Sequence, residues 1–566
     1  MSATPTSFDD GRPGPAPAGA VSVLGRLYRR DLGAYPPTGR RMSYLAIVVV
    51  TTVVLYYMLY VQYAVATSII THFGMTYRYF VWVSVVGNAV GAFASLAAGL
   101  ADRWGRANMV VYGLLAASLL VFFGLPNAGG KAAYLVMFAA VSLIEGVVLV
   151  ATPALIRDFS PQLGRATAMG AWTMGPVVGS LVVTTVTSTT LDTSSWQDEV
   201  RYSGAAGLVV FVVALFALRE LSPALRDQIM VTLRDRALVE ARAKGLDPAA
   251  GRRGEWRQMM RPDITGSALA ISLYLLLYFA AVGNFVVFFA TTYGYTEQRA
   301  NAVANWYWAA NAVALVAVGV LSDRLRVRKP FMIVGAVGSI AATAVFATRA
   351  THPGTDYYTF AWLFVCIGVF SGVAYGPWMA SFTETVEKHN PAATATGLAV
   401  WGWTIRIVVA VSTAFIPVLV TSVTPLVDHG TQVAAAQRQA GPALRVVGAH
   451  PRLFAELGAY PPGKAPAALT ARAVREVGPA DLAVVRKAQP QLALLQKYGT
   501  KVQKASHDGP GQWRDWWWIC IAGQVVFLPF VFLMAGRWSP KRAREDAELH
   551  RQAVEQELAL LAAERS

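Results

Sequence analysis

Two charged side chains interrupt long apolar stretches of this sequence. Arg406 stands within VWGWTIRIVVAVS (residues 400–412), and Glu145 stands within a second apolar stretch that begins near Ala132. A charge at the centre of a bilayer costs from about 2.5 kcal/mol upward, so both side chains are expected to face a protein interior or a water-filled cavity. If each stretch is a membrane-spanning helix, both residues lie about 13 residues, roughly 19 Å, from its start and therefore at similar depth.

The types of these two side chains allow two kinds of chemistry. The planar guanidinium group of Arg406 suits bidentate binding of a substrate carboxylate, but Arg406 and Glu145 could instead form a structural ion pair with each other. Glu145 is the only carboxyl placed deep in an apolar stretch, and all seven histidines lie in connections or tails. It is therefore the candidate for proton coupling, because a carboxyl that has lost its hydration binds a proton readily.

Further polar and aromatic side chains could complete a cavity around these two residues. The candidates are Tyr56, Tyr60, Gln62, Asn88, Tyr278, Asn284, Trp308, Asn311 and Tyr375. We assign to substrate binding, with Arg406 and Glu145, the residues Asn88, Tyr278, Asn284, Asn311 and Tyr375.

A charged turn occurs twice in the sequence. AGLADRWGRANM (residues 98–109) places Asp102, Arg103 and Arg106 between two apolar stretches, and GVLSDRLRVRK (residues 319–329) repeats the pattern. The Asp can accept hydrogen bonds from exposed N–H groups at the start of a helix, and the arginines can bind carboxylates or helix C-termini. The second copy distinguishes the motif from an ordinary charged loop.

Composition identifies the elements that hold these residues as membrane helices. Apolar residues make up 55% of the 566-residue chain, charged residues 14%, and the mean hydropathy is +0.42, a balance typical of membrane proteins. Runs of about 20 apolar residues, the length of a membrane-spanning helix, predict twelve spans. They begin near Tyr44, Tyr79, Asn108, Ala132, Ala166, Gly204, Ile264, Ala300, Phe331, Tyr358, Ala393 and Trp518.

The twelve spans form two repeats of six. FGMT (residues 73–76) returns as YGYT (293–296), and GLADR (99–103) returns as VLSDR (320–324). These offsets of 220 and 221 residues indicate a duplication in which both copies have the same membrane orientation, since six is an even number. The predicted fold is an all-α membrane protein with twelve transmembrane helices in two six-helix bundles.

The distribution of Lys and Arg predicts the orientation. Basic segments precede span 1 and follow spans 2, 4, 8 and 12, all on one side, which the positive-inside rule identifies as cytoplasmic. Both termini are then cytoplasmic, and the expected location is the cell membrane. The predicted parts are a disordered basic tail (1–42), the first bundle (43–219), a cytoplasmic linker (220–262), helices 7–11 (263–423), an extracytoplasmic insertion (424–513), helix 12 (514–536) and a cytoplasmic tail (537–566).

The insertion between spans 11 and 12 is unusually long. Its sequence predicts three short helices, of which PAALTARAVREVG and PADLAVVRKAQPQLALLQKYG are the clearest. A cap over the outer mouth, a docking element for a partner and a passive insertion are the alternatives for its role.

The charged turn resembles the pattern G-x-L-x-D-R-x-G-R, which the major facilitator superfamily carries between helices 2 and 3. The resemblance extends over all twelve spans, although Ala98 replaces the first Gly and Arg326 replaces a Gly in the second copy. It implies a fold of two bundles that rock against each other, with salt bridges at an inner gate. The implied gate residues are Asp102, Arg103, Arg106, Asp323 and Arg324, and their expected partners are Asp158 and Glu384 or Glu387.

A second, weaker resemblance lies in span 5. Gly175-Pro176-x-x-Gly179 is similar to part of a motif of the drug/proton antiporters of this superfamily. Gly and Pro in a membrane helix usually reflect close packing and a bend, and packing is the favoured explanation of these residues.

The sequence favours a transporter over other functional classes. It has no metalloprotease, serine-hydrolase or Walker A motif, which argues against a membrane enzyme or an ATP-driven pump, and no cofactor, metal or catalytic residue is expected. The +16 net charge concentrates between the spans, so nucleic acid is not an expected partner. We expect a monomeric secondary transporter that carries a small organic anion, coupled to protons or a counter-substrate. The alternative is a proton-driven exporter of amphipathic compounds.

Overall fold

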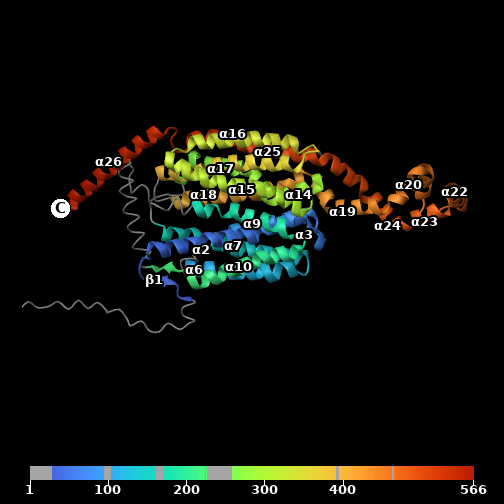
Figure 1. Cartoon of the computed structure of the whole chain (residues 1–566), viewed down its shortest axis with the longest axis horizontal. Helices are drawn as coiled ribbons and strands as arrows, with labels where there is room; N and C mark the ends of the chain where they lie inside the picture. The colour runs from blue at the N-terminus through green and yellow to red at the C-terminus, as the bar shows by residue number, and fades with distance from the viewer. Residues whose placement is uncertain are drawn as a thin grey trace, which may run out of the picture.

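The membrane domain consists of long helices that run side by side, as the apolar runs predict (Figure 1). The computed structural model describes residues 28–94, 104–160, 170–223, 225, 258–352, 354–389, 394–461 and 464–565. Ten helices of this part of the chain are long and apolar enough to cross a membrane. The shorter helices α4 and α9 occupy the places predicted for spans 2 and 5, in agreement with the all-α fold of two six-helix bundles.

The first bundle contains a break in its first span. At Val65 the backbone leaves the helical conformation (φ −121°, ψ 31°), so the span is divided into α2 and α3. The helices of this bundle are α2 (Thr38–Ala64), α3 (Ala66–His72), α4 (Tyr77–Ala94), α6 (Arg106–Leu119, continued by irregular helical turns to Asn127), α7 (Lys131–Phe159), α9 (Gly175–Thr190) and α10 (Trp196–Ala217).

The second bundle also begins with a divided span, because Leu275 interrupts the helix. Its core is rich in aromatic rings, and Phe285 stacks on Phe364 at a centroid distance of 4.7 Å. Its helices are α13 (Pro262–Tyr274), α14 (Leu276–Tyr293), α15 (Glu297–Leu325), α16 (Lys329–Arg349), α17 (Tyr357–His389), α18 (Thr394–Leu419) and α25 (Thr500–Leu533).

The long insertion forms a helical arm that projects from one end of the membrane domain (Figure 1). We call residues Val423–Gly499 the arm, and the end that carries it the arm side. Two small apolar clusters hold the arm together, one around Ala443 and Ala488 and the other around Leu453 and Ala473. Its helices are α19 (Val423–Gln439), α20 (Gly441–Ala449), α21 (Pro451–Gly458), α22 (Ala467–Val477), α23 (Pro479–Lys487) and α24 (Gln489–Leu494), followed by a π-helical turn (Leu495–Gly499).

The predicted boundary between the insertion and the twelfth helix differs from the structure. The boundary at residues 513 and 514 falls inside α25, which is continuous from Thr500 to Leu533. Its 34 residues correspond to roughly 50 Å, longer than the ~30 Å apolar core of a bilayer. The helix therefore extends out of the apolar region toward the arm.

The opposite end of the membrane domain carries residues 28–37 and the helix α26 (Pro540–Arg565), and we call it the terminal side (Figure 1). The prediction of a disordered tail up to residue 42 is wrong for the residues described from 28 onward. Strand β1 (Asp31–Leu32) pairs in parallel with β2 (Glu220–Leu221), and α2 begins at Thr38. The preceding residue, Arg30, is buried.

Candidate functional site

A cavity of about 260 Å³ lies between the two bundles near the middle of the membrane helices. Helices α2, α4, α7 and α9 line it from the first bundle, and α14, α15, α17 and α18 line it from the second. All seven side chains that the sequence analysis assigned to substrate binding line this cavity; they are Asn88, Glu145, Tyr278, Asn284, Asn311, Tyr375 and Arg406. Their role in binding stays a prediction.

Glu145 is buried in the wall of this cavity, with 5% of its surface exposed. Its Oε1 atom has no hydrogen-bond partner among the described residues. The helices α4 and α7 approach closely here, since a Cβ atom on Gly146 would collide with the carbonyl oxygen of Gly91. The carboxyl is thus held on a tightly packed helix pair, and one buried oxygen has no hydrogen-bond partner among the described residues, which is costly unless a bound group or a proton satisfies it.

Arg406 reaches the cavity from the opposite bundle. Its Nη1 atom donates to the carbonyl oxygen of Gly91 at 3.3 Å, and the side chain is half-buried. Within the described part of the chain, neither a hydrogen bond nor an ion pair joins Arg406 to Glu145. The arrangement therefore does not support a permanent ion pair between them, and it leaves both groups with capacity to bind something else.

Tyrosines on one face of α2 form the aromatic part of the cavity wall. Tyr56 and Tyr60 have ring centroids 5.3 Å apart, and Tyr63 follows at 6.3 Å from Tyr60. Two other candidates do not line this cavity. Gln62 faces its own bundle and accepts a hydrogen bond from Tyr134, and Trp308 packs against Tyr278 at 5.1 Å.

The glycines of the span 5 motif have a packing role. A Cβ atom on Gly175 would meet the Thr52 side chain, and one on Gly179 would meet Tyr56, so both glycines allow α9 to lie directly against α2. Pro176, between them, lines the cavity.

On the arm side of the cavity, polar side chains join the two bundles. Tyr77 of α4 donates its hydroxyl to Asn284 of α14 at 2.8 Å, and its backbone N–H donates to Asp428 of the arm at 2.7 Å. Burial raises the pKa of Asp428, whereas the Tyr77 N–H and the charges of His429 and Arg78 lower it. Tyr77 is thus held at its hydroxyl by the second bundle and at its backbone N–H by the arm.

Helices α9 and α15 meet on the same side through a second set of hydrogen bonds. Thr184 donates to the side-chain oxygen of Asn305 at 2.5 Å, and the amide nitrogen of Asn305 donates to Ser188 at 3.0 Å. Together with the contacts of Tyr77, these bonds join the two bundles on the arm side.

On the terminal side, the first charged turn is held by an ion pair and a buried carboxylate. Arg106 pairs with Asp158 at 2.9 Å, and its backbone N–H donates to Glu220 at 2.8 Å. Gly105 has φ +90°, which favours glycine, and Glu220 occupies the space where a Cβ would lie. The predicted partner of Arg106 is therefore in contact with it, while a role in gating stays a prediction. Asp102 and Arg103 lie outside the described residues.

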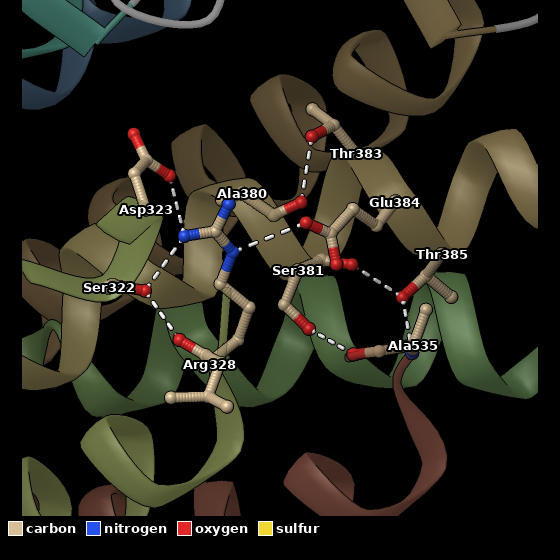
Figure 2. A network of polar contacts seen from close by, with 10 residues as sticks. Ser322, Asp323, Arg328, Ala380, Ser381, Thr383, Glu384, Thr385 and Ala535 are labelled. Carbon is tan, nitrogen blue, oxygen red and sulfur yellow. Dashed lines mark hydrogen bonds and ion pairs between the residues drawn. The ribbon is translucent and has the colours of Figure 1, made fainter. Parts of the chain in front are cut away.

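In the second charged turn, Arg328 is the residue that makes the ion pairs (Figure 2). Its guanidinium lies 2.7 Å from Asp323 and 3.2 Å from Glu384, and it also donates to Ser322 at 2.8 Å. These partners belong to α15 and α17, so Arg328 connects the ends of two helices.

The prediction that Arg324 makes this contact is not supported. Arg324 is exposed, and in the described part of the second bundle Glu384 is bound by Arg328. Arg326 adopts a left-handed conformation (φ 54°) after α15, which turns the chain so that Arg328 returns toward Ser322. Figure 2 also shows Ser381 and Thr385 of α17 bound to Ala535, at the end of the last membrane helix.

The sequence analysis missed Arg328, Glu220 and Arg30. A signal for Arg328 was present, because it follows Arg106 by 222 residues and Glu384 follows Asp158 by 226, so the duplicated ion pair preserves both partners. Glu220 and Arg30 gave no such signal. Arg30 donates to Asn108 at 2.9 Å and to the carbonyls of Leu215 and Leu218 at the end of α10.

Comparisons with solved structures give the same fold. A bacterial homologue of the human lysosomal transporter Spinster, in an inward-facing and occupied conformation, has 16% identity and a TM-score of 0.54 over 88% of this chain and 97% of its own. A D-xylose–proton symporter has 14% identity and a TM-score of 0.51 over 66% of this chain and 90% of its own. No relative was found among curated protein sequences. The family model of the Major Facilitator Superfamily matches residues 45–411, and the chain therefore belongs to this superfamily of membrane transporters.

Proposed function

We propose that this protein is a secondary active transporter that carries a small organic anion by alternating access, coupled to protons or to a counter-substrate. The observation that supports the proposal most directly is the placement of Arg406 and Glu145. They come from opposite bundles, line one cavity and do not pair with each other. A guanidinium at this depth requires an anionic partner, and a substrate carboxylate can supply one.

The same placement explains how a proton can be coupled to an anion. When Glu145 is ionised, its charge competes with the substrate carboxylate for the guanidinium of Arg406. When it is protonated, the competition ends and the cavity retains the positive charge that attracts the anion. Proton binding and anion binding then favour each other, and by linkage the effect is reciprocal.

The orientation in this proposal follows from the basic segments of the sequence. The terminal side, with both chain ends, is the cytoplasmic side of the cell membrane, and the arm is extracytoplasmic. Because Tyr77 is bound to Asn284 and Asp428, the state described here is closed toward the outside.

The tyrosine-rich wall of the cavity favours a second candidate function. Tyr56, Tyr60 and Tyr63 offer aromatic faces that suit lipophilic and cationic compounds. A proton-driven exporter of amphipathic compounds would use these rings for binding and Glu145 for the proton. The glycines of span 5 add little to this alternative, because their contacts with α2 explain them by packing.

A direct test uses purified full-length protein. Thermal-shift measurements against a panel of small carboxylates and a panel of lipophilic amines identify the class that binds, and uptake into proteoliposomes with an imposed pH gradient then measures transport. Stabilisation by carboxylates, lost in Arg406→Gln, is the expected result. Stabilisation by amines alone would replace the anion proposal with the exporter.

A further inference from the structure

The break in the first span places unsatisfied backbone groups at the contact between the two bundles. Where a helix is interrupted, the last carbonyls of the first segment and the first N–H groups of the second have no partner in the helix. Here the interruption at Val65 leaves the carbonyl of Ala64 and the N–H of Ser68 without such partners. In the interior of a membrane protein both groups must be satisfied by other side chains.

Helix α15 of the second bundle supplies both partners. Glu297, its first residue, accepts hydrogen bonds from the N–H of Ser68 at 2.9 Å, from the Ser68 hydroxyl at 2.5 Å and from the Thr67 hydroxyl at 2.5 Å. Asn301, one turn later, donates its amide to the carbonyl of Ala64 at 2.9 Å. A carboxylate and an amide four residues apart lie on one helix face, so a single face of α15 satisfies both sides of the break.

The three donors at Glu297 suit an ionised carboxylate. Glu297 is only 9% exposed, and the two nearby basic side chains, Arg299 of α15 and His72 of α3, contact aromatic rings. Arg299 lies over the rings of Tyr295 and Tyr357, and the His72 ring meets Phe73 and Trp196 edge-on. The carboxyl group is therefore held by the hydrogen bonds from the first bundle, and separation of the bundles removes all of them together.

We propose that Glu297 is a positioning residue of the transport cycle, a latch on Thr67 and Ser68 that holds the arm side closed. The latch rests on alternating access, as proposed above, but not on the identity of the substrate or of the coupled ion. Glu297 is not one of the predicted gate residues of the two charged turns, and it does not line the cavity. It acts by setting the balance between the closed and open states of the arm side, without contact with the substrate.

The experiment measures access to the cavity from each side of the membrane. A cysteine replaces Ser84, which lines the cavity, in full-length protein whose native Cys366 and Cys520 are changed to Ala. A membrane-impermeant maleimide is then applied from the arm side alone or from the terminal side alone. The parent protein is expected to react mainly from the terminal side.

In Glu297→Gln the rate of labelling from the arm side should rise by about tenfold, because charge-assisted hydrogen bonds are lost from the closed state alone. Labelling from the terminal side should fall. Ser68→Ala should act in the same direction, and Ser68→Thr, which keeps a hydroxyl donor, should restore the parent pattern. Glu456→Gln is the matched control, since this carboxylate lies in the arm and pairs with Arg472 at the surface.

The outcomes separate the latch from the proposed function. Unchanged arm-side labelling in both Glu297→Gln and Ser68→Ala, with the cavity still reactive from the terminal side, would overturn the latch. Equal increases from both sides would also overturn it, because a loosened fold and not a shifted gate would then be responsible. A parent protein that reacts equally from both sides would instead contradict alternating access, on which both proposals depend.

Discussion

Arg406 is the residue whose chemistry distinguishes the proposed functions most clearly. Within the described part of the chain, its guanidinium makes one hydrogen bond, at 3.3 Å to a backbone carbonyl, so its other N–H groups can donate to a carboxylate. Lysine keeps the charge but loses the planar bidentate geometry. Arg406→Lys should therefore weaken carboxylate binding by about 1 to 3 kcal/mol, and Arg406→Gln should weaken it more.

Titration calorimetry of the purified variants with a bound carboxylate measures this effect. Arg445→Lys is a suitable control, because Arg445 is exposed on the arm and far from the cavity in sequence. Normal carboxylate affinity in Arg406→Lys and Arg406→Gln would contradict the proposed anion site.

Glu145 carries the prediction on proton coupling. If its protonation removes competition for Arg406, Glu145→Gln mimics the protonated state permanently. The variant should bind the anion at all pH values and exchange it across the membrane, but accumulation driven by a pH gradient should be lost. Proteoliposome uptake and counterflow, measured at several pH values, test the two halves of this prediction. A variant with an unchanged pH profile would remove Glu145 from the coupling mechanism.

The sequence was sufficient to predict the cavity residues because charges and amides are costly in apolar spans. That cost places Arg406, Glu145 and the three asparagines in the interior. It does not determine which interior surface a side chain faces. Gln62 and Trp308 are equally buried, but Gln62 bonds within its own bundle, and Trp308 packs behind Tyr278 and does not line the cavity.

At the scale of elements, the ion pairs of the terminal side hold neighbouring helices together within each bundle. Arg328, with 15% of its side chain exposed, pairs with two carboxylates from α15 and α17. Arg328→Gln removes the cation that pairs with Asp323 and Glu384. It should lower the free energy of unfolding by about 1 kcal/mol, because both carboxylates are partly exposed to solvent. Arg324→Gln, which changes the exposed residue just before the last residue of α15, should have little effect.

Thermal unfolding of both variants in detergent checks this difference between two arginines of one motif. A larger loss of stability in Arg324→Gln than in Arg328→Gln would contradict the assignment. The sequence suggested Arg324 because it follows Asp323 in the motif that the second charged turn resembles. The arginine that pairs with Asp323 and Glu384 instead follows the left-handed turn at Arg326, and this depends on backbone conformation that a motif does not specify.

At the scale of the whole molecule, the spans were predictable and their extensions were not. The length of a membrane helix is set by the bilayer, which the apolar runs match directly. The defined structure of residues 28–37 depends instead on tertiary contacts, above all the burial of Arg30 against the end of α10. Likewise, α25 continues beyond the apolar run to Thr500 because α19 packs beside it.

The structure of the arm predicts that the membrane domain folds without the outer portion of the arm. Its outer portion is held by the apolar cluster of Leu453, Ala473 and Val477, which is separate from the core of the membrane domain. Ala443 and Ala488 belong to the cluster nearer the base, so a short Gly/Ser linker can join them when residues 444–487 are removed. This deletion should leave membrane insertion, the thermal unfolding midpoint and labelling of the Ser84→Cys cavity site unchanged.

The base of the arm should behave differently from its outer portion. Asp428 remains in the shortened protein and accepts the hydrogen bond from Tyr77 at the start of α4, a position where a carboxylate stabilises a helix. Asp428→Ala in the full-length chain should therefore increase arm-side labelling of the cavity, although it removes a single side chain. If the deletion opens the cavity and Asp428→Ala does not, the outer portion of the arm, and not its base, holds this side of the transporter closed.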